Sequence, residues 1–191
     1  NDDSAAVLVS ETTLRGGAAL SVRNSVLWAR TTAKARFNAM EWGPDSSATG
    51  PDVAITLENV TITSDTASTQ SGRGGHAVRF VSSPRALAER ARFVVRDAAI
   101  SVSSRETECA AVRLQSGSAI RDAASFLVDS STVVVESPSA ANGIVLQDDG
   151  SGVLQGAAMN WTGVSVNVTS TASSSNVLFV KTGARVADQS T

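Results

Sequence analysis

The sequence predicts a single-stranded parallel β-helix, an all-β solenoid with three short strands in each of about five rungs. The first observation is a repeat, because segments 93–102, 126–135 and 159–168 are similar and begin 33 residues apart. The second is that each repeat contains three runs of alternating apolar residues, and the third is that turn-favouring residues separate these runs. If rungs stack, each run pairs with its counterpart about 4.8 Å away, giving three parallel sheets around an apolar core.

Every second residue is apolar within each of the three runs. This alternation, in residues that favour β structure, predicts strands with one buried face. In one repeat the runs are Phe93/Val95, Ile100/Val102 and Val112/Leu114. In the next they are Phe126/Val128, Val133/Val135 and Ile144/Leu146, and in the last Met159/Trp161, Val166/Val168 and Val177/Phe179. We expect these side chains to face the core and their chain neighbours to face outward.

Turn-favouring residues occupy fixed places between the runs. Asn24, Asn59 and Asp97 follow the first run, where an Asx residue tolerates the left-handed conformation of a tight turn. Glycines 117, 150 and 183 follow the third run, where we also expect a left-handed residue. A further apolar position recurs at a spacing of 33 residues and consists of Leu87, Ile120, Val153 and Val186.

Two earlier rungs precede these repeats. The first contains Leu14, Leu20/Val22 and Leu27, with its third strand near Met40 and Trp42; the second contains Ile55/Leu57 and Ile62, with its third strand at 77–80. Two excursions interrupt the period, near 30–51 and 64–75, and we expect them to leave the solenoid as loops. Segment 84–92 has helical propensity, but Leu87 and Phe93 keep the register of the repeat, which favours a β rung.

The chain has 191 residues, 42% of them apolar, which suits one elongated core. We expect residues 1–191 to be one segment of a longer β-helix, because no polar cap is evident at either end and solenoids need caps. No apolar run approaches the ~20 residues of a transmembrane helix. Cys109 is the single cysteine, so no internal disulfide can form, and we expect it to be buried as a small apolar residue.

A net charge of −2 conceals two oppositely charged segments. Residues 73–105 contain seven arginines and two acids, whereas residues 106–149 contain seven acids and two arginines. Because rungs stack in sequence order, a basic band should lie beside an acidic one. Either these bands attract each other, or the basic band binds sulfated glycans or another acidic surface through bidentate arginine contacts. The arginines of this expected anion-binding band are Arg73, Arg79, Arg85, Arg90, Arg92 and Arg96.

Three tripeptides match the N-glycosylation pattern, with Asn59, Asn160 and Asn167 as the acceptors. Asn160 and Asn167 alternate with inward-facing residues and should point outward, whereas Asn59 should lie in a turn. These asparagines are either glycosylated or ordinary exterior residues of a β-helix.

Residues typical of catalytic or sugar-binding sites are few. His76 is the only histidine, which excludes a Ser/His/Asp relay and a multi-histidine metal site. Its glycine-rich approach, residues 72–75, predicts an exposed turn. The chain has no tyrosine, so a platform for stacking sugars would depend on Trp28 or Trp42.

Three pairs of acids could in principle act as catalytic or calcium-binding groups, namely Asp2/Asp3, Glu106/Glu108 and Asp148/Asp149. Glu106 and Glu108 should lie in a strand connection near Arg105 and Arg113. Residues 148–149 precede a glycine and should form a turn, because calcium needs about 6–8 oxygen ligands and no others accompany them. We therefore expect no catalytic residue, no metal site and no cofactor.

Several phrases of the chain resemble the repetitive ectodomain of the dispersed gene family protein 1 group, which are very large surface proteins of trypanosomes. The phrases are LSVRNSVLWA (20–29), ITLENVTITS (55–64), FVVRDAAISV (93–102), AVRLQSGSAI (111–120) and FLVDSSTVVV (126–135). They share an Ala/Arg/Ser/Val-rich composition, and an apolar-x-Val-Arg-Asx motif recurs at 20–24 and 93–97. The Arg-Asx pair is lost at 129–130 and 162–163.

The resemblance implies a pectin-lyase-like β-helix, a cell-surface location, glycosylation and adhesion to host matrix or cells, and it brings no catalytic residues. We therefore expect a non-enzymatic surface segment whose partners are matrix proteins or sulfated glycans, besides neighbouring rungs of the parent chain. A polysaccharide lyase or hydrolase of the same fold and a purely structural spacer are the alternatives. We expect no nucleic-acid binding, because the charge is balanced, and no membrane contact.

Overall fold

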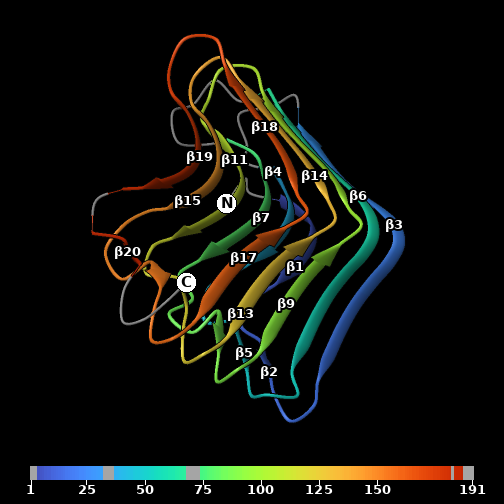
Figure 1. Ribbon diagram of the computed structural model, residues 1–191, viewed down its shortest axis with the longest axis vertical. Coiled ribbons are helices and arrows are strands. Elements are labelled where there is room, and N and C mark those ends of the chain that lie inside the picture. Colours follow the sequence, from blue (N-terminus) through green and yellow to red (C-terminus); the bar gives the residue numbers. More distant parts are fainter. Residues whose placement is uncertain (1–3, 32–36, 68–73, 182, 187–191) are drawn as a thin grey trace.

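The computed structural model describes residues 4–31, 37–67, 74–181 and 183–186, and this part of the chain contains twenty strands and no helix (Figure 1). The strands form three parallel sheets, here called A, B and C, which wind around one core. Successive rungs stack along a common axis, from β1 at one end to β20 at the other. The predicted parallel β-helix of about five rungs is confirmed.

Each sheet collects the equivalent strands of successive rungs. Sheet A contains β1 (Ser4–Val9), β4 (Phe37–Trp42), β7 (His76–Val81), β11 (Cys109–Gln115), β15 (Ala141–Leu146) and β19 (Ser175–Val180). Sheet B contains β2 (Thr13–Leu14), β5 (Ser47–Thr49), β8 (Leu87–Ala88), β12 (Ala119–Ile120), β16 (Gly152–Val153) and β20 (Arg185–Val186). Sheet C contains β3 (Ala19–Thr31), β6 (Ala54–Thr66), β9 (Arg92–Arg96), β10 (Ala99–Ser104), β13 (Ser125–Asp129), β14 (Thr132–Ser137), β17 (Ala158–Thr162) and β18 (Ser165–Ser170).

Sheet C is bent at one position in every rung. The residues at the bend all have positive φ, between 46° and 62°; they are Asn24, Asn59, Asp97, Ser130 and Gly163. The bend was predicted at the Asx residues. However, the first and second runs belong to one sheet rather than two, because the ladder continues on both sides of the bend. The third sheet is instead sheet B, built from the two- and three-residue strands around the Leu87 position.

The core is formed by the inward-facing residues of all three sheets. The rings of Phe93 and Phe126 stack with their centroids 4.8 Å apart, and Phe80 packs edge-on against both. Ladder pairing joins Phe93 to Phe126 and Leu87 to Ile120, which confirms the predicted 33-residue register. Segment 84–92 is therefore part of a β rung, as expected, and not a helix.

The predicted register is wrong by one residue in the last strand of sheet A. Ile144 pairs with Leu178 and Leu146 pairs with Val180, so Val177 and Phe179 are not the inward-facing residues. The cause is the connection before β19. Twelve residues separate Val166 from Leu178, whereas eleven separate Val133 from Ile144, and the additional residue shifts the alternation.

The interval 30–51 is expected both to interrupt the period and to hold a third strand near Met40 and Trp42, and the strand is confirmed, whereas residues 32–36 lie outside the described part. The interval contains β4 and β5, and Met40 and Trp42 of β4 are buried in the core. The second excursion, 64–75, begins inside β6 and ends where β7 starts, and its residues 68–73 lie outside the described part. Both intervals therefore contribute strand residues to the solenoid.

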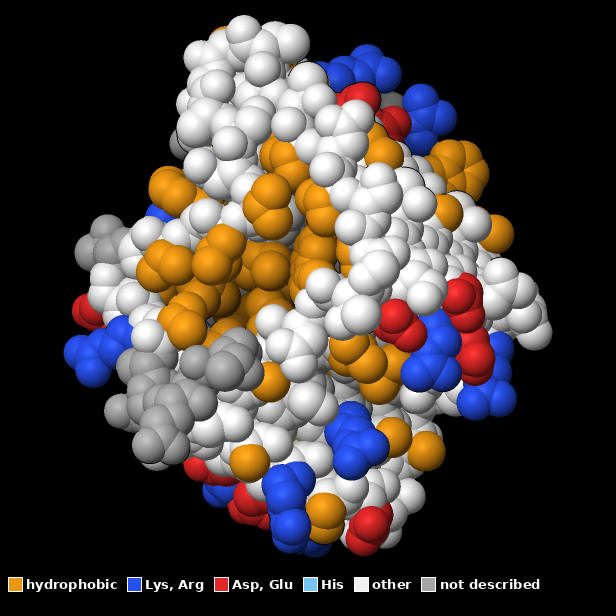
Figure 2. All heavy atoms as spheres, in the orientation of Figure 1, with side chains coloured by type: hydrophobic (Ala, Val, Ile, Leu, Met, Phe, Trp, Pro, Cys, Tyr) orange, Lys and Arg blue, Asp and Glu red, His pale blue; other side chains and the backbone are white. Residues whose placement is uncertain are grey.

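The core is open to solvent at the last rung. Figure 2 shows apolar side chains around a hollow in this face of the molecule. The hollow has a volume of about 100 Å³ and is lined by Ile144, Leu146, Val153, Met159, Leu178 and Val186. Leu178 and Val186 are about half-exposed in this lining, because no described strand follows β19 and β20 on this side.

Candidate anion-binding site

The six arginines expected to form one anion-binding band do not lie together. Arg79 is buried, and its Nη1 lies 2.8 Å from Oε2 of Glu41. Arg85 forms surface ion pairs with Glu89 and with Asp122 of the next rung. Arg73 lies outside the described residues. Only Arg90, Arg92 and Arg96 line a common site.

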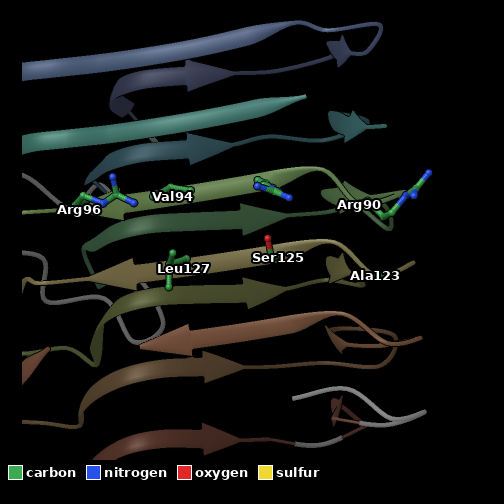
Figure 3. A pocket seen from close by; sticks show the side chains of 7 residues that line it. Arg90, Val94, Arg96, Ala123, Ser125 and Leu127 are labelled. Carbon is green, nitrogen blue, oxygen red and sulfur yellow. The ribbon is translucent and has the colours of Figure 1, made fainter. Parts of the chain in front are cut away.

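These three arginines surround a recess on the outer face of sheet C (Figure 3). The recess has a volume of about 430 Å³ and is lined by Arg90, Arg92, Val94, Arg96, Ala123, Ser125 and Leu127. The lining residues come from β9 and β13 and from the turns that precede these strands. None of them is acidic, so no carboxylate lines the recess.

Strand alternation explains the shape of the recess. Every second residue of a strand points outward, which places Arg92, Val94 and Arg96 of β9 in one row on the surface. The next rung places Ser125 beside Arg92 and Leu127 beside Val94. Because the Ser125 side chain is much smaller than that of Arg92, it leaves a depression in the surface beside Arg92. The side chains of Val94 and Leu127 form the floor of this depression.

Arg90 reaches the recess from the turn between sheets B and C. Its φ is 67°, and the equivalent residues in later rungs, Ala123 and Gly156, also have positive φ. The Arg90 amide donates to the carbonyl oxygen of Asp122, which joins this turn to the next rung. Figure 3 shows Arg90 at the turn and Arg96 at the opposite end of the recess.

The three guanidinium groups differ in how far they are neutralised. Nε of Arg96 lies 3.4 Å from Oδ2 of Asp129 on the next rung. Arg90 and Arg92 are exposed, and within the described part of the chain neither forms an ion pair. Arg92 and Arg96 are separated by about 13 Å along the strand, from four residues at about 3.3 Å each. The recess therefore has two free positive charges at one end and a paired one at the other.

His76 is not in an exposed turn, so that prediction is wrong. It is the first residue of β7, it is buried, and its Nε2 lies 3.5 Å from Nη1 of Arg113. The approach is fixed by packing, because a Cβ at Gly74 would overlap the carbonyl oxygen of Glu108. Gly74 therefore allows close contact between these two chain segments.

A buried polar row on sheet A was missed by sequence reasoning. Glu108 pairs with Lys181 at 2.7 Å and accepts from Asn142 at 3.3 Å, whereas Arg113 hydrogen-bonds Gln147. Glu108 therefore has Lys181, a residue that the sequence did not suggest, as an ion-pair partner. The 33-residue period could have identified this row. Applied to sheet A, it places polar residues of successive rungs beside one another or within a few residues of such a pair.

The remaining candidate residues occupy structural positions. Trp42 is fully buried in the core because the third run faces inward, which leaves only Trp28, 61% exposed on β3, as a surface indole. Oδ2 of Asp148 accepts from the Ser116 amide at 3.2 Å, as suits a turn. Among the described residues, no three His, Cys, Asp or Glu side chains are grouped so that they could hold a metal ion.

Cys109 is buried, as predicted. Its thiol donates to the carbonyl oxygen of Glu136 at 3.4 Å. Burial, together with the nearby negative charges of Glu108 and Glu136, raises the pKa of the Cys109 thiol to about 12. This cysteine is therefore a neutral thiol and not a nucleophile.

The three sequon asparagines have the predicted placement. Asn59 lies at the bend of sheet C, and its Nδ2 donates to Oδ1 of Asn24 at 2.8 Å. Asn160 on β17 and Asn167 on β18 are exposed on the outer face of the same sheet. Their glycosylation stays a prediction.

The described residues include no helix of the length and apolarity that a membrane crossing requires. Comparison of the chain with models of protein families, with curated proteins and with solved structures finds no match. Among the described residues, Arg90, Arg92 and Arg96 line a recess without an acidic residue in its lining.

Proposed function

We propose that this β-helix is a non-enzymatic, cell-surface segment that binds acidic glycans of the extracellular matrix. The observation that carries the proposal is the recess itself, where Arg90 and Arg92 are exposed and form no ion pair with any described residue. Guanidinium groups bind sulfate and carboxylate groups through paired hydrogen bonds, which makes arginine the suitable residue for such ligands.

The shape of the recess favours a sugar rather than a small anion. Val94 and Leu127 form an apolar floor between Arg92 and Arg96. The apolar face of a sugar ring can lie on this floor while acidic substituents reach the guanidinium groups at either end. The separation of about 13 Å between these two arginines suits a chain of more than one sugar, since a single ring does not span it.

The expected affinity of one recess is modest. The arginines are exposed, so salt screens their interactions and each contact contributes little by itself. Several copies of the chain at one surface would compensate for this weakness, because their recesses could bind one polymer together. Salt-sensitive, avidity-dependent binding is therefore the expected behaviour of this site.

A polysaccharide-cleaving activity has less support. Such a site needs convergent carboxylates together with a basic residue, and the lining of the recess contains no carboxylate. Two acids of the next rung, Asp122 and Asp129, are paired with Arg85 and Arg96. The remaining alternative is a purely structural spacer, and a binding experiment can distinguish it from a glycan-binding segment.

The test is binding of the chain to immobilised heparin, a sulfated glycan, at low and at physiological salt. The recess variant is Arg90→Ala/Arg92→Ala. The control is Arg23→Ala/Arg30→Ala, which removes the same charge from exposed positions of β3. We expect the recess variant to bind at least roughly tenfold more weakly, and the control to bind like the wild type.

Two results would contradict the proposal. Equal losses in both variants would indicate general charge attraction without a defined site. Absence of binding by the wild type at either salt concentration would favour the structural spacer.

A further inference from the structure

We propose that an N-linked glycan on Asn160 controls access to the arginine-lined recess. This inference rests on the proposed function, because it concerns regulation of the same site. Its basis is the ladder of sheet C, in which Asn160 of β17 pairs with Leu127 of β13, and Leu127 pairs with Val94 of β9. Val94 and Leu127 are the apolar floor of the recess.

The three residues therefore form one outward-facing column on successive rungs. Neighbouring strands lie about 4.8 Å apart, so Asn160 lies one strand from Leu127 and about 10 Å from Val94. Asn160 itself is exposed and does not line the recess. It borders the recess directly, on the side of the last rung. A glycan attached there, which extends over several sugar units, is large enough to cover the floor.

Asn160 is also the sequon asparagine whose side chain is free to accept a glycan. The Asn59 amide nitrogen donates to Asn24, and the Asn167 oxygen accepts from Thr169 at 3.2 Å. The side-chain amide of Asn160 forms no hydrogen bond with any described residue, and Thr162 of its sequon is exposed. Strand β17 is moreover at the edge of sheet C, so one side of its backbone is unpaired.

The modification requires a lipid-linked oligosaccharide pyrophosphate as the donor. Nδ2 of Asn160 forms a bond to C1 of the first sugar and loses a proton, while the bond from C1 to the pyrophosphate oxygen breaks. The lipid pyrophosphate leaves, and no oxidation or reduction takes place. The product is a neutral, bulky amide beside the recess, so the predicted effect on binding is steric rather than electrostatic.

Asn167 provides a matched control on the same rung. It lies only seven residues further along the chain, but beyond the bend at Gly163 and in a different column. In that column Asn167 pairs with Val134, which in turn pairs with Ser101. A glycan there projects from the other arm of sheet C. Its presence should leave the recess open.

The experiment compares four samples of the chain produced in a eukaryotic secretory host. They are the wild type, the wild type after enzymatic removal of N-glycans, Asn160→Gln and Asn167→Gln. Mass spectrometry measures occupancy at each sequon, and binding to immobilised heparin measures access to the recess. We expect occupied wild type and Asn167→Gln to bind at least roughly tenfold more weakly than the deglycosylated chain and Asn160→Gln.

The outcomes separate this inference from the proposed function. An unoccupied Asn160, or equal heparin binding with and without its glycan, would overturn the inference while leaving the recess as a binding site. If the deglycosylated chain and Asn160→Gln also fail to bind, the proposed function fails and the inference fails with it. If Asn167→Gln restores binding as fully as Asn160→Gln, the effect does not depend on position and the inference is wrong.

Discussion

Val133 and Val134 are adjacent in β14 but face opposite sides of sheet C, so equal substitutions at the two positions test the register of the solenoid. Val133 is fully buried, and its ladder neighbours are Ile100 and Val166. Val134 is half-buried on the outer face, between Ser101 and Asn167. The change to aspartate adds the same charge in both variants.

The expected magnitudes differ strongly. Val133→Asp removes apolar burial of about 2 kcal/mol and places a carboxylate among apolar neighbours, which costs several kcal/mol more. The sum exceeds about 5 kcal/mol, which approaches the whole stability of a typical domain, about 5–15 kcal/mol. Val134→Asp keeps its carboxylate near solvent and polar side chains, so a loss of less than about 1 kcal/mol is expected.

Urea unfolding followed by far-UV circular dichroism measures both changes. Because Val133→Asp is expected not to fold, Val133→Ala supplies a measurable value, with a loss of about 2 kcal/mol from two methyl groups and the cavity they leave. Wild-type-like unfolding of Val133→Asp, or equal losses at the two positions, would show that β14 does not have this register.

Three further substitutions or measurements probe the packing of the rungs. Gly74→Ala should destabilise the chain by more than about 2 kcal/mol, because the new Cβ would overlap the carbonyl group of Glu108. Gly156→Ala should cost only about 1 kcal/mol, because the residue has a φ of 72° but open space around it. Similar urea midpoints for the two variants would refute this expectation. Ala123→Gly should raise the stability by up to about 1 kcal/mol, because alanine there has φ of 59°, and a lower urea midpoint would contradict the assigned turn. Cys109 should react with a thiol reagent at pH 8 only after unfolding. Since its pKa is raised from 9.0 to about 12, its contribution to stability is complete below pH 9 and is lost as the pH rises toward 12; rapid labelling of the folded chain would disprove its burial.

The fold was predictable from the sequence because a solenoid repeats its contacts at a fixed spacing. The pairing of Leu87 with Ile120 follows directly from the period of 33 residues. The error at β19 has the same origin, since the period changes by one residue after Val166. The sequence shows that a connection is one residue longer. Only the packing decides whether that residue stays in the connection or shifts the register of the following strand.

The site was predictable only in part. Sequence order places rungs beside one another, so it correctly suggested that arginines of 73–105 face acids of 106–149, as Arg85 and Asp122 do. It did not distinguish the faces of sheet A from those of sheet C. Arg79 of β7 belongs to a buried polar row, whereas Arg92 of β9 lies at the surface, although both alternate with apolar residues. Both faces of β7 are buried, whereas β9 has an exposed face, and the alternation in the sequence does not show this difference.

The residue one rung away decides whether an outward-facing arginine stabilises the fold or remains available to a ligand. In one column of sheet C, Arg23 pairs with Glu58 and Arg96 pairs with Asp129, so charges of successive rungs neutralise one another. In the column that contains Ala54, Arg92 lies between that alanine and Ser125, and neither neighbour carries a charge. The two columns are four residues apart on the same strand. Replacing Ser125 with aspartate would extend the pairing to Arg92, and it should weaken heparin binding while the fold is preserved, because the new carboxylate competes with the glycan for the same guanidinium group.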